Sequence, residues 1–340
     1  MSVKEVANAV IPIQKKGLLQ KFGTQRLVAI IALATLYVFF CLAGDNFATY
    51  STFVSILDSS YYTGFLAIGV TFVIITGGID LSCGTIMVCC ALISGTLYTK
   101  LGVPMWLCLI LCIVMGGLFG FCNGFMVAVM GLPAFIATLG TMMVTRGLGS
   151  IVTATASVTY PQRSADDGWF RGIFKIMGEG LPSGGVPTGF LLLIVLAVIM
   201  AFVMNKTKPG RYILALGSNK EATRLSGVSV VKWEILAYVI SGLFAGLAAI
   251  SYASIYSTIL PGTGNGFELD AIAGTVIGGT SLSGGIGSIA GTLIGVFIMS
   301  VLKTGLPFVG LQPHYQLFFT GFVLVIAVFA DVLNRRRQKN

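Results

Sequence analysis

The sequence predicts an all-α, polytopic membrane protein with about ten transmembrane helices and both termini on the cytoplasmic side. Its composition is the first reason: of 340 residues, 56% are hydrophobic and only 10% are charged, whereas about a quarter of the residues of a soluble domain are charged. Apolar runs of roughly 15–25 residues, long enough to cross a bilayer as helices, recur along the chain. Lysine and arginine gather in segments that a ten-span arrangement places on one side of the membrane.

The apolar runs give the expected membrane segments in chain order. They lie at residues 26–44, 60–76, 82–98, 106–130, 134–154, 189–204, 233–252, 269–279, 286–302 and 315–330. The eighth run is shorter than the others and is bordered by glycines. The 44 glycines of the chain are typical of closely packed membrane helices, in which small residues let backbones approach.

The distribution of basic residues orients these segments. Fifteen of the 21 lysines and arginines lie at residues 1–26, in the loop 205–232 and in the tail 331–340. Cytoplasmic segments carry such an excess. We therefore expect a cytoplasmic N-terminal segment (1–25), a single transmembrane domain (26–330) and a basic cytoplasmic tail. The net charge of +9 then reflects membrane topology rather than binding of nucleic acid. Arg146, near the end of an expected helix, fits either side.

The opposite, outer side receives one long loop, at residues 155–187. Glycines and prolines recur along it, as is typical of turns and loops. Trp169, Phe170 and Phe174 favour a short helix at the membrane interface. These aromatic residues are interpreted either as an interfacial anchor or as part of a docking surface for an external partner.

Two short glycine-rich breaks resemble each other. GGIDLSCG at 77–84 and GGTSLSGG at 278–285 share glycine, leucine and serine at matching places, and each lies between two apolar runs. Such breaks in corresponding halves are typical of transporters built from repeats, whose pathway lies near the interrupted helices. Both breaks are expected on the same side, so an inverted repeat is not indicated. The glycines expected to form the breaks are Gly77, Gly78, Gly278, Gly279, Gly284 and Gly285.

Asp80 is the one acidic residue inside an otherwise apolar hairpin. A charge at the bilayer centre costs about 2.5–3.5 kcal/mol on insertion scales, so Asp80 should face protein, a turn or a cavity. It either belongs to a translocation pathway or caps the helix that follows, where a carboxylate accepts backbone N–H bonds.

Nothing in the sequence indicates a catalytic residue. The seven cysteines lie in or beside apolar segments and His314 is the only histidine, so we expect no metal site. Glycine clusters such as GGTSLSGGIGS lack the Lys-Ser/Thr ending of a phosphate-binding loop. Any nucleotide is therefore expected on another subunit.

The segment GSNKEATRLSGV, at 217–228, is polar although it lies between long apolar runs. Pro209-Gly210 predicts a turn before it, Ser218 or Asn219 is a suitable N-cap, and Gly227 can end a two-turn helix. This short helix is either a plain solvated loop element or a rigid contact for a cytoplasmic motor.

The motifs in this order resemble the permeases of monosaccharide-type ABC importers, the ribose, xylose and galactose permease family. GSNKEATRLSGVSV is similar to the family's cytoplasmic coupling segment, and GGIDLSCG to its early turn. NGFMVAVMGLPAFIATLGTMMVTRGL, from Asn123 to Leu148, resembles its central signature, and GFELDAIAGTVIGGTSLSGGIGS, at 266–288, its late one. The resemblance covers about residues 50 to 333.

The resemblance implies a function and two kinds of site. The chain would be the permease subunit in a bacterial inner membrane, importing a monosaccharide delivered by an extracytoplasmic binding protein. It would pair with a second permease copy or homologue and with an ATP-binding subunit that holds ATP and Mg²⁺. The residues implied to dock on the ATPase are Lys220, Glu221, Ala222, Arg224 and Gly227. Those implied to line the pathway are Asp80, Ser82, Asn123, Thr138, Thr141, Ser281 and Ser283.

Three alternatives stay open at this point. An ion-coupled secondary transporter would use Asp80, a channel or structural membrane protein would need no nucleotide, and a related permease could carry an amino acid or nucleoside. One departure from the family concerns VLKTGLPFVG, where relatives often have asparagine before the Gly-Leu pair and this chain has Lys303-Thr304. If Lys303 faces the outer vestibule, it would alter binding-protein contacts or favour a more polar cargo.

Overall fold

The computed structural model describes residues 24–312 and 314–339, with side chains at the two ends of this range left aside. The longer helices are α3 (Thr24–Ala43), α4 (Tyr50–Ile75), α5 (Cys83–Leu101), α6 (Met105–Ala128), α7 (Ala134–Thr153), α8 (Thr188–Lys206), α11 (Val230–Ile255), α13 (Ile289–Gly305) and α14 (His314–Lys339). The shorter ones are α9 (Lys208–Ser218), α10 (Lys220–Leu225), α12 (Phe267–Ile277) and the 3₁₀ helices η1 (Asp166–Ile173) and η2 (Leu306–Val309).

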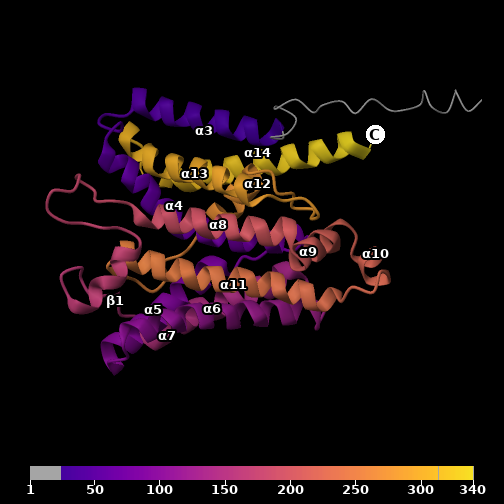
Figure 1. The fold of residues 1–340 in the computed structure, drawn as a ribbon, viewed down its shortest axis with the longest axis horizontal. Coiled ribbons are helices and arrows are strands. Elements are labelled where there is room, and N and C mark those ends of the chain that lie inside the picture. The colour runs from indigo at the N-terminus through magenta and orange to yellow at the C-terminus, as the bar shows by residue number, and fades with distance from the viewer. Residues whose placement is uncertain (1–23, 313, 340) are drawn as a thin grey trace, which may run out of the picture.

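The long helices lie roughly side by side, and their connections gather at two opposite ends (Figure 1). One end holds α9 and α10, and the C-terminal end of α14 lies there too. The other end holds the segment between α7 and α8. Its strand β1 (Val158–Thr159) pairs antiparallel with β2 (Thr258–Ile259), which lies between α11 and α12. The N-terminal calls at residues 1–23, including Lys4, Lys15, Lys16 and Lys21, lie outside the described residues.

Each of the ten expected segments coincides with a helix, but the count of ten spans is not established. Among the described residues, seven helices are long and apolar enough to cross a membrane: α4, α5, α6, α7, α8, α11 and the run Ile289–Val309. The apolar stretches of α3 and α14 that qualify, Leu27–Ala43 and His314–Ile326, are shorter. At 11 residues, α12 is about 17 Å long, too short for a hydrocarbon core of about 30 Å.

The short helix α12 lies beside the second half of α4. The rings of Tyr62 and Phe267 are 5.3 Å apart, and Thr275 Oγ1 donates to the Ala67 carbonyl at 3.3 Å. The segments on either side of α12, residues 256–266 and 278–288, contain no helix. Irregular backbone at membrane depth is tolerated where protein buries it.

The core is organised around α4 and α11. Every residue of α4 from Ser60 to Ile75 is buried, as expected of a helix with neighbours on all sides. α11 packs on α6 through glycines: a Cβ at Gly116, Gly120, Gly242 or Gly246 would overlap the opposite backbone. Such small-residue seams let two membrane helices approach closely.

α4 begins ten residues earlier than the predicted run 60–76. The Thr49 hydroxyl caps it by accepting from the Thr52 N–H at 3.2 Å. The added turns carry Asp58, whose Oδ2 lies 2.7 Å from Lys175 Nζ. A prediction made from apolar runs leaves such polar turns out of the helix, although they are helical.

Candidate functional site

The helix predicted in GSNKEATRLSGV is present as α10. The Asn219 side-chain oxygen accepts from the Ala222 N–H at 2.9 Å, which makes Asn219 the N-cap rather than Ser218. Gly227 follows the helix with a φ of 79°, in the left-handed region that glycine tolerates best. The local sequence alone thus determines where α10 begins and ends.

α10 offers an exposed surface made of three side chains. Glu221 and Arg224 form an ion pair of 2.6 Å, and Leu225, a residue that the sequence reasoning missed, is 79% exposed. Thr223 points inward and is buried. A small rigid helix with an apolar tip and a charged flank suits insertion into a groove of another protein.

Lys220 is exposed, as Glu221 and Arg224 are, and its ammonium also forms an ion pair within the chain. Its Nζ lies 2.9 and 2.8 Å from the two carboxylate oxygens of Glu234, near the start of α11. The Glu234 side chain is only 8% exposed, whereas that of Lys220 is 57% exposed. The ion pair therefore attaches α10 to α11.

The expected turn at Pro209-Gly210 is wrong, because both residues lie in the first turn of α9. Proline is tolerated there, since the first N–H groups of a helix have no intrahelical partner. α9 carries the chain from α8 to α10, and its last residues, Gly217 and Ser218, lie against the Ile75 carbonyl and Gly285, respectively.

The two glycine-rich breaks meet at this point. The Gly285 N–H donates to the Ile75 carbonyl at 2.8 Å, which joins the second break to the end of α4 just before the first. A Cβ at Gly217 would overlap the Ile75 carbonyl, and one at Gly284 would lie 2.9 Å from the Gly217 carbonyl and 3.0 Å from the Gly77 N–H. Both breaks are thus on the α9–α10 side, as predicted, and α9 packs directly on them.

Two of the break glycines act differently from the others. Gly278 has an ordinary helical φ of −66°, and a Cβ there would overlap the carbonyl of Gly291, at the start of α13. Gly78 lies against the Tyr238 hydroxyl. Gly77, Gly279, Gly284 and Gly285 instead have positive φ values. Ser281 is buried within the second break, and Ser283 is exposed on it.

Asp80 is fully buried and accepts three hydrogen bonds. Its Oδ1 accepts from the Ser82 N–H at 2.9 Å and the Ser82 hydroxyl at 2.6 Å, and its Oδ2 accepts from the Ser241 hydroxyl of α11 at 2.7 Å. The N-cap position of α5 belongs to Ser82, so Asp80 stabilises the turn before α5 rather than capping the helix itself.

Three further predicted pathway residues extend this buried network. The Asn123 amide donates to Ser82 Oγ at 2.8 Å and its oxygen accepts from Thr141 at 2.5 Å. Thr138 donates to the Ala134 and Ile79 carbonyls at 2.8 and 3.3 Å. The structure therefore brings Asp80, Ser82, Asn123, Thr138 and Thr141 together, at the junction of α5, α6, α7 and α11, where each side chain has a partner within the chain.

On the opposite end, the segment between α7 and α8 contains the expected short helix as η1. The aromatic residues do not act as one unit, however: Phe170 and Phe174 are buried, and only Trp169 is exposed. Arg171 fixes η1 by donating to the carbonyls of Pro161 at 2.7 Å and Ser254 at 2.9 Å. Burial, and secondarily Arg163, lower the pKa of this guanidinium.

Lys303, where the chain departs from the family pattern, is held inside the chain. Its Nζ lies 2.9 Å from Asp270 Oδ2, and 4.8 Å from the centroid of the Phe267 ring. The ion pair joins α12 to α13, so Lys303 has an internal structural contact.

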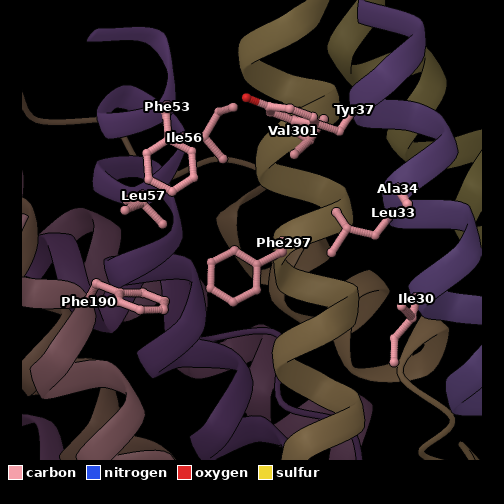
Figure 2. Close-up of a pocket in the computed structure, with 10 residues that line it drawn as sticks. All are labelled: Ile30, Leu33, Ala34, Tyr37, Phe53, Ile56, Leu57, Phe190, Phe297 and Val301. Carbon is pink, nitrogen blue, oxygen red and sulfur yellow. The ribbon is translucent and has the colours of Figure 1, made fainter. Parts of the chain in front are cut away.

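A groove of about 420 Å³ lies between α3, α4, α8 and α13 (Figure 2). Its lining is apolar and consists of Ile30, Leu33, Ala34, Tyr37, Phe53, Ile56, Leu57, Phe190, Phe297 and Val301. Such a surface suits hydrocarbon rather than a hydrogen-bonding cargo. Within the described residues no group of His, Cys, Asp and Glu could hold a metal ion.

Comparison with known proteins agrees with a transport role. The model of the family described as "Branched-chain amino acid transport system / permease component" matches residues 52–328. The ribose import permease protein of Escherichia coli K12 is 36% identical over 305 residues, which cover 89% of this chain and 92% of the relative.

Two further relatives differ in the sugar that their names give. The fructose import permease protein of Rhizobium meliloti is 33% identical over 89% of this chain and 83% of its own length. The xylose transport system permease protein of E. coli K12 is 33% identical over 94% of this chain and 95% of its own. No solved structure gives a significant match. A family model that covers most of the helical bundle, together with these full-length relatives, shows that the chain belongs to this family of transport-system permease components.

Proposed function

We propose that the chain is the membrane-spanning permease subunit of an ATP-driven ABC importer that brings a monosaccharide into a bacterial cell across the inner membrane. The observation that carries the proposal is the position of α10: an exposed rigid helix whose base is fixed to the bundle by the Lys220–Glu234 pair. The relatives named for ribose, fructose and xylose import support a sugar as cargo.

The contacts of α9 and α10 suggest how movement passes into the bundle. An ATP-binding subunit, which holds ATP and Mg²⁺, would contact Glu221, Arg224 and Leu225. Displacement of α10 would then act on α11 through Glu234, and on both glycine-rich breaks through Gly217. Because the motor changes shape with nucleotide, its differential contacts would shift the permease between inward- and outward-facing states.

The topology that accompanies this proposal has about ten segments and both termini in the cytoplasm. It is supported by the clustering of basic residues at the α9–α10 loop and in the C-terminal tail. The C-terminal end of α14 lies at the same end of the bundle as α10 (Figure 1). An even number of crossings would place them so.

The proposed assembly contains a second permease copy or a homologue, an ATPase and an extracytoplasmic sugar-binding protein. The binding protein would dock on the end that holds η1, where Trp169 is exposed. An amino acid or a nucleoside is the alternative cargo, and the description of the matching family favours the former. An ion-coupled carrier is less well supported, because the two carboxylate oxygens of Asp80 already accept three hydrogen bonds.

Co-purification tests the proposal. The solubilised chain should retain an ATP-binding subunit, and Glu221→Lys should lose it, since the reversed charge repels Arg224 and changes the exposed flank of α10. Lys100→Glu, a charge reversal at the far end of the bundle, is the matched control and should retain the ATPase. A chain that comes out alone and transports under an ion gradient would instead support the secondary transporter.

A further inference from the structure

Arg146 is a charged residue in the middle of a membrane helix that none of the roles above explains. It stands twelve residues after the start of α7 at Ala134 and seven before its end at Thr153, about 18 and 10 Å from the two ends. An ionisable side chain at such a depth is expected to face protein or a water-filled cavity rather than lipid.

The Arg146 guanidinium is positioned by Asn265, in the irregular segment before α12. Arg146 Nη2 donates to Asn265 Oδ1. Arg146 is partly exposed and Asn265 is exposed, so this polar pair reaches the surface of the single chain. Gly264 and Gly266, on either side of Asn265, have φ values of 94° and 87°, a conformation that other residues rarely adopt.

Glu268, in the first turn of α12, supplies the opposite charge. It interacts electrostatically with Arg146 and is only 7% exposed. Its Oε1 accepts from the Gly266 N–H at 3.2 Å. Its Oε2 and the Nε of Arg146 are both buried and have no hydrogen-bond partner, although burial of such atoms without a partner is costly.

A cavity of about 10 Å³ adjoins Arg146, and its lining is partly polar and partly apolar: Thr85, Thr145 and Thr263, with Val88, Cys89, Leu92 and Gly262. That volume holds about one water molecule. Arg146 Nε is thus a buried donor without a partner beside this small space, and Glu268 Oε2, which does not line it, is a buried acceptor without a partner. The Asp80 network differs from it, because both carboxylate oxygens of Asp80 accept hydrogen bonds, and the Lys303–Asp270 pair differs because its two charged groups lie 2.9 Å apart.

We propose that Arg146, Asn265 and Glu268 form a subsite for the hydroxyl groups of a neutral, polyhydroxylated cargo on its route through the permease. The guanidinium donates, the carboxylate accepts, and the amide does both, which matches adjacent hydroxyls that each donate and accept. The positive and negative charges cancel, so the subsite favours a neutral ligand over an ion. This inference rests on the proposed function and assigns residues to its cargo route.

Thiol labelling of the full transporter, with its ATPase and in proteoliposomes, tests whether this face meets water. The charged, thiol-specific reagent MTSET should modify Asn265→Cys faster than Val198→Cys, a matched variant at a 63% exposed position of α8. The unsubstituted chain gives the background of its seven native thiols. Equal, background-level labelling of the two variants would overturn the proposal, whatever the cargo is.

Uptake of radiolabelled D-ribose, D-fructose and D-xylose tests the contact with cargo. Arg146→Gln should reduce uptake at low sugar concentration by about ten-fold or more, as expected for loss of a charged hydrogen bond. Basal ATP hydrolysis and co-purification of the ATPase should stay unchanged, and Arg146→Lys should restore part of the uptake. Lys100→Gln is the control for loss of one positive charge.

Unchanged uptake by Arg146→Gln would overturn the proposal even if Asn265→Cys reacts. Failure of the proposed function is a separate result, because it appears as an absent ATPase in the co-purification of the unsubstituted chain. Arg146→Lys keeps the charge and most of the volume, so it remains informative if Arg146→Gln does not fold.

Discussion

Lys220 Nζ lies within 2.9 Å of both carboxylate oxygens of Glu234, so the first residue of α10 is joined to the first turns of α11. α11 is also the helix whose Ser241 binds Asp80 and whose glycines pack on α6. The ion pair thus connects an exposed helix with the most central contacts of the bundle.

Glu234→Gln should weaken transport more than it weakens the fold. Since Lys220 is more than half exposed, its ammonium can be solvated when the partner is neutral, and the cost in unfolding free energy should be about 1 kcal/mol or less. Uptake per ATP hydrolysed should fall, because α10 is no longer fixed to α11. The double exchange Lys220→Glu with Glu234→Lys is the control and should recover uptake; full coupling in Glu234→Gln would show that the pair transmits nothing.

Leu225→Asp should reduce binding of the ATPase. A leucine that is 79% exposed at the end of a helix gains little for the isolated chain, so its removal leaves the stability of the chain nearly unchanged. If it fills an apolar groove of the motor, a carboxylate there should lower affinity by about ten-fold or more. Binding of the purified ATPase to the permease in nanodiscs measures this. Leu101→Asp, at a 71% exposed position on the end of α5, should bind the ATPase normally.

The helices were predictable because their signal is local. Each of the ten apolar runs coincides with a helix, and Asn219, with Gly227 after the helix, determines the limits of α10. α9 was missed, since Pro209-Gly210 indicates a turn when the neighbouring structure is unknown, although a proline fits equally well in a first helical turn. The early start of α4 was missed because its first turns are polar.

The site was only partly predictable because its contacts join distant parts of the chain. Asp80 was identified from its apolar surroundings, but its partner Ser241 is 161 residues away. The contact of Lys220 with Glu234 depends on where α11 passes, and the place of Arg146 depends on the segment that holds Asn265, 119 residues later. Whether a polar membrane residue is satisfied or left with a free hydrogen-bonding atom follows only from tertiary structure.

Asp80→Asn should be tolerated better than Asp80→Leu. The asparagine oxygen can still accept from Ser82, and the Ser241 hydroxyl can rotate to accept from the new amide, so we expect a loss of about 1 kcal/mol. Leucine leaves three buried donors without an acceptor and should cost several times as much. Thermal unfolding in detergent measures both, with Ser241→Ala as a control of intermediate effect. Abolished uptake in a stable Asp80→Asn would instead assign the carboxylate to the pathway or to ion coupling.

Gly278→Leu should abolish uptake, whereas Gly321→Leu should not. A Cβ at Gly278 would overlap the carbonyl of Gly291, so α12 and α13 must separate to accept any side chain. Backbone atoms cannot move aside as a flexible side chain can, and we expect a loss of about 3 kcal/mol or more in stability. Gly321, on α14, has nothing within 4 Å of its Cβ position. Expression, thermal unfolding and uptake should be compared for both, with Gly278→Ala as the smallest enlargement. Normal uptake by Gly278→Ala would mean that the contact between α12 and α13 loosens during transport, which a helix only about 17 Å long can do without breaking its own hydrogen bonds.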